Sequence, residues 1–179
     1  MRVERMKDNE KQESMRLLFP KYIREYITLS SDHLTSTTVL SYLLDIQDFM
    51  EWLIVSYYPE KKAIAEITLA DLEELDEMDI SHYRSHLKHR PIPQNTDKRY
   101  YKTANTERTV NRKISALRSL FTFLHTRRDR SGKPYLSKDA MENVNVRQIQ
   151  VSAKAKAEKL KAPIIHENEI EDLIDFIMN

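Results

Sequence analysis

The chain of 179 residues is 40% hydrophobic and 32% charged, and its formal net charge is +1. This composition is typical of a globular protein and excludes a wholly disordered chain. The lack of cysteine excludes a disulfide framework, a cysteine zinc site and a thiol nucleophile, and the lack of a long apolar run leads us to expect a cytoplasmic protein with no membrane partner.

Glycine is nearly absent from the chain, which holds only Gly132. Sheet proteins need glycine at turns with positive φ, whereas long helices need few such positions. The composition therefore predicts an all-α protein.

The first half of the chain shows two long helical patterns. Residues 12–28 have helical periodicity, and Pro20 requires a break or a new helix start within them. The capping residues 35–37 precede an apolar helix over about 37–57, which Pro59 closes. Spacings of three and four in this helix predict one buried stripe, made of Leu43, Ile46, Met50, Leu53 and Tyr57.

Shorter patterns follow in the middle of the chain. ITLADLEEL reads as a short helix capped by Thr68, and DEMDISHYRSHLKHR reads as a helix that ends before Pro91. Residues 91–104 form a polar loop, and a long helix then begins near Asn105 or Thr106. Beyond it we expect a turn at RSGKPY, a short capped helix at SKDAMENV, a polar linker over about 147–162 and an amphipathic helix at HENEIEDLIDFIMN.

Charge is sorted along the chain, although the net charge is small. Residues 98–130 carry ten cations and two acids, whereas residues 60–79 carry eight acids and two cations. A positive side attracts phosphate whatever the net charge is.

The helix over about 105–128 places two sets of residues on opposite faces. Its predicted core face holds Val110, Ile114, Leu117, Phe121 and Leu124. The opposite face carries cations and hydrogen-bonding side chains without an acid: Arg108, Asn111, Arg112, Ser115, Arg118, Ser119, Thr122 and Thr126. Such side chains bind phosphate oxygens, Arg and Asn also read base edges, and an α-helix fits the major groove of DNA. A solvated surface helix is the alternative reading of the same pattern.

Three stretches resemble the N-terminal core-binding domain of tyrosine recombinases, the phage-integrase and Xer family. TVNRKISALRSLFTFL is similar to the last DNA-contacting helix of that domain, TTVLSYLLDIQDFMEWL to its first helix, and ITLADLEELDEMDISHYRSHL to the segment between them. The residues that match the pattern of the last helix are Thr109, Asn111, Arg112, Ser115, Ala116, Leu117, Arg118, Phe121, Phe123 and Leu124. The extra LLFPKYIREYI and RDRSGKPYLSKDAMENV resemble the XerS-type branch most.

The resemblance implies a small orthogonal helical bundle of the SAM-like kind over 35–146. A helical N-terminal extension over 1–34 would precede it, and a basic linker over 147–163 and the start of a catalytic domain over 164–179 would follow. In this family two domains clamp duplex DNA, and the second domain supplies the catalytic Arg, Lys, His and nucleophilic Tyr. None of that catalytic set can be matched in this chain, so we expect it not to be an enzyme by itself.

The same resemblance implies the partners and the contacts. The partners are double-stranded DNA and, for the full-length protein, further protomers of a tetramer on that DNA. The predicted DNA-binding residues are Thr37, Thr38, Lys98, Arg99, Arg108, Thr109, Asn111, Arg112, Ser115, Arg118, Ser119, Thr122, Lys154 and Lys156.

Other candidate chemistry favours ordinary roles. His82, His86 and His89 have helical spacing but no evident further metal ligand, so we expect no metal and no other cofactor. Tyr100 and Tyr101 lie near cations and are expected to pack or to contact phosphate, and we expect Trp52 in the core. Two rival functions stay open, which are a helical protein-interaction module and a stand-alone DNA-binding regulator of transcription.

Overall fold

Helices and the turns that connect them make up the described part of the chain, which a computed structural model gives for residues 10–90, 105–129 and 131–144. These residues all fall within one compact unit of the chain, residues 1–147. No strand occurs in the described ranges, where the only β-type pairing is an isolated bridge between Arg128 and Pro134. The predicted all-α class is confirmed.

The N-terminal helical pattern is split at Pro20, as predicted. Residues 10–16 are helical, and α2 (Lys21–Ser30) begins directly after Pro20, which lies in extended backbone at φ −63°. Proline suits this position because its fixed φ and missing N–H cost a helix start little. Helix α2 then buries one face, made of Tyr22, Ile23, Tyr26 and Ile27.

Helix α3 (Ser36–Ser56) is the long apolar helix, and Thr35 caps it by accepting a hydrogen bond from the Thr38 amide at 3.3 Å. The predicted stripe is buried at Leu43, Ile46, Met50 and Leu53. Its last member is wrong, because Tyr57 is 38% exposed. The helix ends at Ser56, and Tyr57 leaves the helical path at φ −127°.

Two short helices close the middle of the described chain. After a 3₁₀ turn, η1 (Ile64–Glu66), come α4 (Leu69–Glu74) and α5 (Glu77–His89). Each of these two α-helices begins with a capping box, in which Thr68 pairs with Asp71 and Asp76 pairs with Asp79. These reciprocal bonds satisfy the free amides of the first turn. Three of the acids in residues 60–79, which are Asp71, Asp76 and Asp79, therefore have a local structural role.

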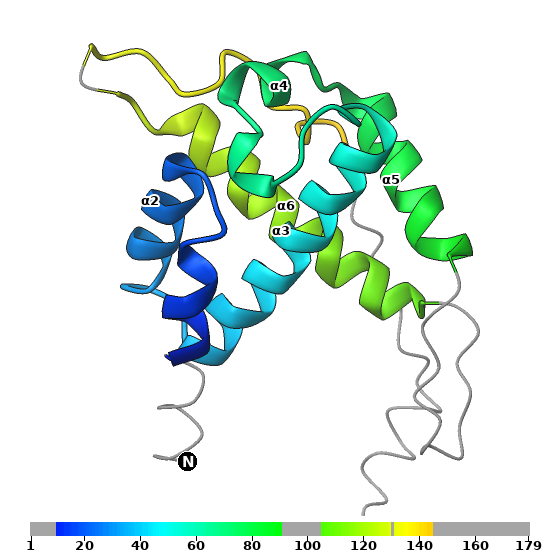
Figure 1. Cartoon of the computed structure of the whole chain (residues 1–179), viewed down its shortest axis with the longest axis horizontal. Helices are drawn as coiled ribbons and strands as arrows, with labels where there is room; N and C mark the ends of the chain where they lie inside the picture. The colour runs from blue at the N-terminus through cyan, green and yellow to red at the C-terminus, as the bar shows by residue number, and fades with distance from the viewer. Residues whose placement is uncertain (1–9, 91–104, 130, 145–179) are drawn as a thin grey trace, which may run out of the picture. The chain divides into compact units, whose positions relative to one another are not determined.

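Helix α6 (Glu107–Thr126) lies against α2, α3 and α5. In Figure 1 it crosses α3, and the first turns of both helices lie toward the same lower side of the picture. The Thr106 side chain caps it by accepting from the Thr109 amide at 3.2 Å. The predicted core face is confirmed, since Val110, Ile114, Leu117, Phe121 and Leu124 are all buried.

The segment after α6 turns back onto the bundle. Gly132 has φ +83° in the predicted turn, a conformation that suits glycine. The short helix predicted at SKDAMENV is wrong, because residues 140–143 form a turn. The segment is too short to form a stable helix by itself, and burial of Ala140, Met141 and Val144 sets its path instead.

Replacing Leu117 with alanine tests the central place of α6. Leu117 is fully buried in the core that the helices share, so Leu117→Ala should lower the free energy of unfolding by about 2–5 kcal/mol. Leu44→Ala is the matched control, because Leu44 is 42% exposed and its loss should cost well under that amount. Urea unfolding followed by circular dichroism measures both, and equal losses would contradict the packing described above.

Candidate nucleic-acid interface

A narrow stripe of polar side chains runs the length of α6 away from the core. Its members follow each other at spacings of four and three, and we call them the α6 stripe: Arg108, Arg112, Ser115, Ser119, Thr122 and Thr126. Ser115 and Ser119 are half-buried and the other four residues are exposed. None of its six residues is an acid, and its first half, which carries Arg108 and Arg112, has the chemistry of a surface that binds an anion.

Two residues expected on this face lie elsewhere. Asn111 is only 9% exposed, and Arg118 is half-buried and donates to the backbone carbonyl of Val144. Both occupy the edge of the polar face, and at Arg118 the segment after α6 packs against the helix. The expectation that Asn111 and Arg118 lie on the open face is therefore wrong.

Several hydroxyl groups of the interface already have protein partners. Tyr26 donates to Ser119 at 2.9 Å, and Thr122 donates to the Asp139 carboxylate at 3.4 Å. Thr109 shares a 2.9 Å hydroxyl contact with the cap residue Thr106. The second half of the α6 stripe also borders a groove of about 640 Å³ between α2 and α6. The first half, around Arg108 and Arg112, is the more open part.

Two further candidate contacts are threonines of α3. Thr37 and Thr38 lie in the first turn of α3, and Thr38 makes a 2.8 Å hydroxyl contact with Thr35. The first turns of α3 and α6 lie toward one side in Figure 1. Helix N-termini carry partial positive charge and favour anions.

A buried charge network ties α3 and α5 to α6. Asp45 on α3 has only 1% of its side chain exposed, and it accepts hydrogen bonds from the Arg112 guanidinium and, at 3.1 Å, from Lys113. Lys113 also lies 3.0 Å from Asp48. Arg90 makes two bonds to Asp48, at 2.6 and 2.8 Å. We call these five residues the carboxylate network; its two acids and three cations leave one positive charge in excess.

Opposite pKa shifts distinguish the two carboxylates. Burial raises the pKa of Asp45 above its ordinary value, and the nearby Lys113 and Arg112 offset this only in part. Burial also acts on Asp48, but bonds from Arg90 and Lys113 outweigh it and hold the Asp48 pKa below its ordinary value. The environment of Asp48 therefore favours its ionised form, whereas burial disfavours the ionised form of Asp45 and two cations oppose that effect.

This network was not predicted from the sequence. Asp45 interrupts an apolar helix, and Lys113 lies in α6 beside core positions, at 9% exposure. A buried charge requires an opposite charge close by. Asp45 and Lys113, two charged residues at positions where the helical pattern predicts burial, could have indicated the pair. They are 68 residues apart in the sequence, so the pattern alone does not join them.

Remaining candidate residues fall into two groups. Lys98, Arg99, Lys154 and Lys156, together with Tyr100 and Tyr101, lie outside the described residues.

The three histidines are exposed on α5. Among the residues described, no group of three or more His, Cys, Asp or Glu is placed to hold a metal ion, and no helix is both long and apolar enough to cross a membrane. Trp52 is half-buried against the core and stacks on Phe49.

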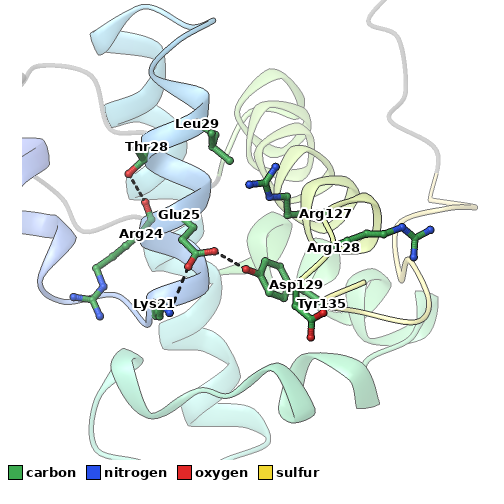
Figure 2. A pocket seen from close by; sticks show the side chains of 9 residues that line it. All are labelled: Lys21, Arg24, Glu25, Thr28, Leu29, Arg127, Arg128, Asp129 and Tyr135. Atoms are coloured by element: carbon green, nitrogen blue, oxygen red, sulfur yellow. Dashed lines mark hydrogen bonds and ion pairs between the residues drawn. The ribbon is translucent and has the colours of Figure 1, made fainter. Parts of the chain in front are cut away.

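A second cationic surface lies between α2 and the end of α6 (Figure 2). This pocket of about 510 Å³ is lined by Lys21, Arg24, Glu25, Thr28, Leu29, Arg127, Arg128, Asp129 and Tyr135. Its acids are engaged, because Glu25 accepts from the Tyr135 hydroxyl at 2.6 Å and Asp129 accepts from the backbone of its own turn. Figure 2 shows Arg127 reaching toward α2 and Arg128 pointing away from it. Cations and apolar groups therefore share this surface.

Comparison with known proteins finds curated relatives along most of the chain. A protein named tyrosine recombinase XerS from Streptococcus agalactiae is 31% identical over 170 residues, which are 94% of this chain and 47% of the relative. Proteins of the same name from Streptococcus mutans and Lactococcus lactis are 28% and 26% identical, again over 47% of their length. The chain thus spans about half the length of the curated relatives it matches. No family model and no solved structure matches it.

Replacing Asp48 with asparagine tests the charge network through pH. The Asp48 pKa is lowered in the folded state, so its ionised form stabilises the fold above about pH 4, the ordinary carboxyl value, and this contribution is lost as pH falls below it. Near pH 7, Asp48→Asn should cost roughly 3 kcal/mol. Urea unfolding from pH 7 to pH 3 should show the difference from wild type shrinking as the solution becomes more acidic. A difference that is constant or grows would contradict the network as described.

Proposed function

We propose that the chain is a member of the tyrosine recombinase family and that its helical region 35–146 binds duplex DNA as the N-terminal, DNA-clamping part of a site-specific recombinase. The longer protein would carry out strand exchange with further protomers on the DNA. This chain contributes DNA binding, and we assign no catalytic residue to it.

One observation carries the proposal, which is the acid-free α6 stripe. A solvated helix face ordinarily mixes both signs of charge, since opposite charges pair at four-residue spacing. Here Arg108 and Arg112 are exposed on the first half of α6, and only serines and threonines follow them along the stripe. An α-helix fits the major groove, where Arg can bind guanine edges and hydroxyl groups can bind either bases or phosphates.

The contacts divide into two kinds in this proposal. Arg108, Arg112 and Ser115 enter the groove with the first half of α6. Thr37 and Thr38, in the first turn of α3, bind a neighbouring phosphate, and Thr109 supports the same turn of α6. We propose Lys98, Arg99, Lys154 and Lys156 as further phosphate contacts, which add affinity without sequence preference.

A protein-interaction module is the second candidate function, and the pocket in Figure 2 favours it. Its lining joins the apolar groups of Leu29 and Tyr135 to the cations Arg24 and Arg127. Such a mixed surface suits an acidic peptide as well as a nucleic acid. The two candidates are distinguished by which arginines DNA binding requires.

Salt dependence tests DNA binding by the chain. If about five phosphates are neutralised, the slope of log K against log salt should be about −4 to −5. Fluorescence anisotropy of a labelled duplex at several salt concentrations gives this slope. No binding even at low salt would remove the DNA proposal and leave the interaction module.

Alanine at Arg108 tests the site of binding. Arg108→Ala should weaken binding, by about 1–3 kcal/mol on a preferred site if the side chain reads a base edge and equally on all duplexes if it binds phosphate. Arg24→Ala is the matched control, since it removes the same exposed side chain from the pocket on α2 and should have little effect. The reverse order of losses would place the DNA on the pocket.

A further inference from the structure

We propose that Asp45 is a positioning residue for DNA recognition, because its buried carboxylate fixes the Arg112 guanidinium on the α6 stripe with its remaining N–H groups turned toward the DNA. This inference rests on the proposed function. Asp45 itself has 1% of its side chain exposed and therefore cannot reach a ligand.

Arg112 is the member of the carboxylate network that joins the buried part to the surface. Its side chain is 46% exposed, and one terminal amino group donates to Asp45. A guanidinium has five N–H donors. That bond uses one of them, so donors remain on the half-exposed side chain for a phosphate or a guanine edge. One side chain can thus hold the buried acid and a ligand together.

The network also keeps Asp45 from repelling an anionic ligand. Lys113 holds the other oxygen of the carboxylate at 3.1 Å and has 11% of its side chain exposed. The two acids of the network face three cations, and Arg112 is the most exposed of these cations, with 46% of its side chain exposed against 27% for Arg90 and 11% for Lys113. The excess positive charge is therefore presented to solvent through Arg112.

Fixing Arg112 before binding should favour selectivity over bare affinity. A free arginine loses rotamer freedom when it binds, whereas a side chain already held by the fold has lost that freedom in advance. A held guanidinium also meets a base edge at one angle only. A freed guanidinium still attracts phosphate but loses its fixed angle to the bases.

The variant Asp45→Asn is suited to a test in the full 179-residue chain. Asparagine keeps the shape and one acceptor oxygen, and Lys113 keeps its second partner, Asp48. Asp48→Asn is the matched control, since it removes the same charge one turn further along α3 without touching Arg112. Circular dichroism establishes that each variant is folded at the assay temperature.

The probe is a duplex that the wild-type chain selects from a random-sequence pool, compared with a scrambled duplex of equal length. For Asp45→Asn the ratio of the two affinities should fall about five- to tenfold, while binding to the scrambled duplex stays equal or rises. In an Arg112→Ala background the same substitution should change the ratio less than twofold. Asp48→Asn should leave the ratio within twofold of wild type.

Three results would overturn the inference without touching the proposed function. One is an unchanged ratio for Asp45→Asn, and the second is an equal fall with and without Arg112, which would make Asp45 a purely structural residue. The third is a fall for Asp48→Asn as large as that for Asp45→Asn, because loss of charge in the network would then explain both. If neither the wild type nor any variant binds either duplex, the proposed function itself is wrong.

Discussion

A carboxylate that is almost fully buried must be matched by cations, and this requirement fixes how α3 and α6 meet. Asp45 lies in a helix that otherwise buries apolar residues, and two consecutive residues of α6, Arg112 and Lys113, supply the match. Removing one partner of such a group leaves an uncompensated charge in the interior, which is strongly unfavourable. A rotation or slip of α6 along α3 would do the same, so the pairing selects one register from those that apolar packing alone would allow.

The rotation of α6 then decides which of its residues can meet a partner. With Val110, Ile114 and Leu117 in the core, the helix has a narrow open face, and the α6 stripe occupies it. Arg118 lies at the edge of that face and donates a hydrogen bond to the backbone carbonyl of Val144. The same geometry leaves Arg112 half outside while it serves Asp45. Packing, charge matching and the proposed recognition of DNA therefore depend on one setting of one helix.

Local sequence signals predicted much of this arrangement, whereas contacts between residues far apart in the sequence could not be predicted. Pro20, Thr68 and the apolar spacing of α6 each act within a few residues, so their consequences could be predicted from the chain alone. The predicted open face of α6 was too wide, because a helical projection does not include the segment after α6 that contacts Arg118. SKDAMENV has helix-forming residues, yet burial of Met141 overrides that tendency. Pairing of Asp45 with Lys113 joins positions far apart in sequence, and only two misplaced charges hinted at it.

The most direct test of the account is to follow the arginine side chains while DNA binds. In the ¹⁵N-labelled chain, the Nε–H signals of Arg108 and Arg112, assigned by Arg→Lys variants, are recorded during titration with the selected duplex. If Arg108 and Arg112 bind the duplex, both signals shift with the binding isotherm, while the signal of Arg90, which is held by Asp48, stays in place. Shifts confined to Arg24 and Arg127 in the pocket of Figure 2, with the Arg112 signal unchanged, would contradict DNA binding by the α6 stripe.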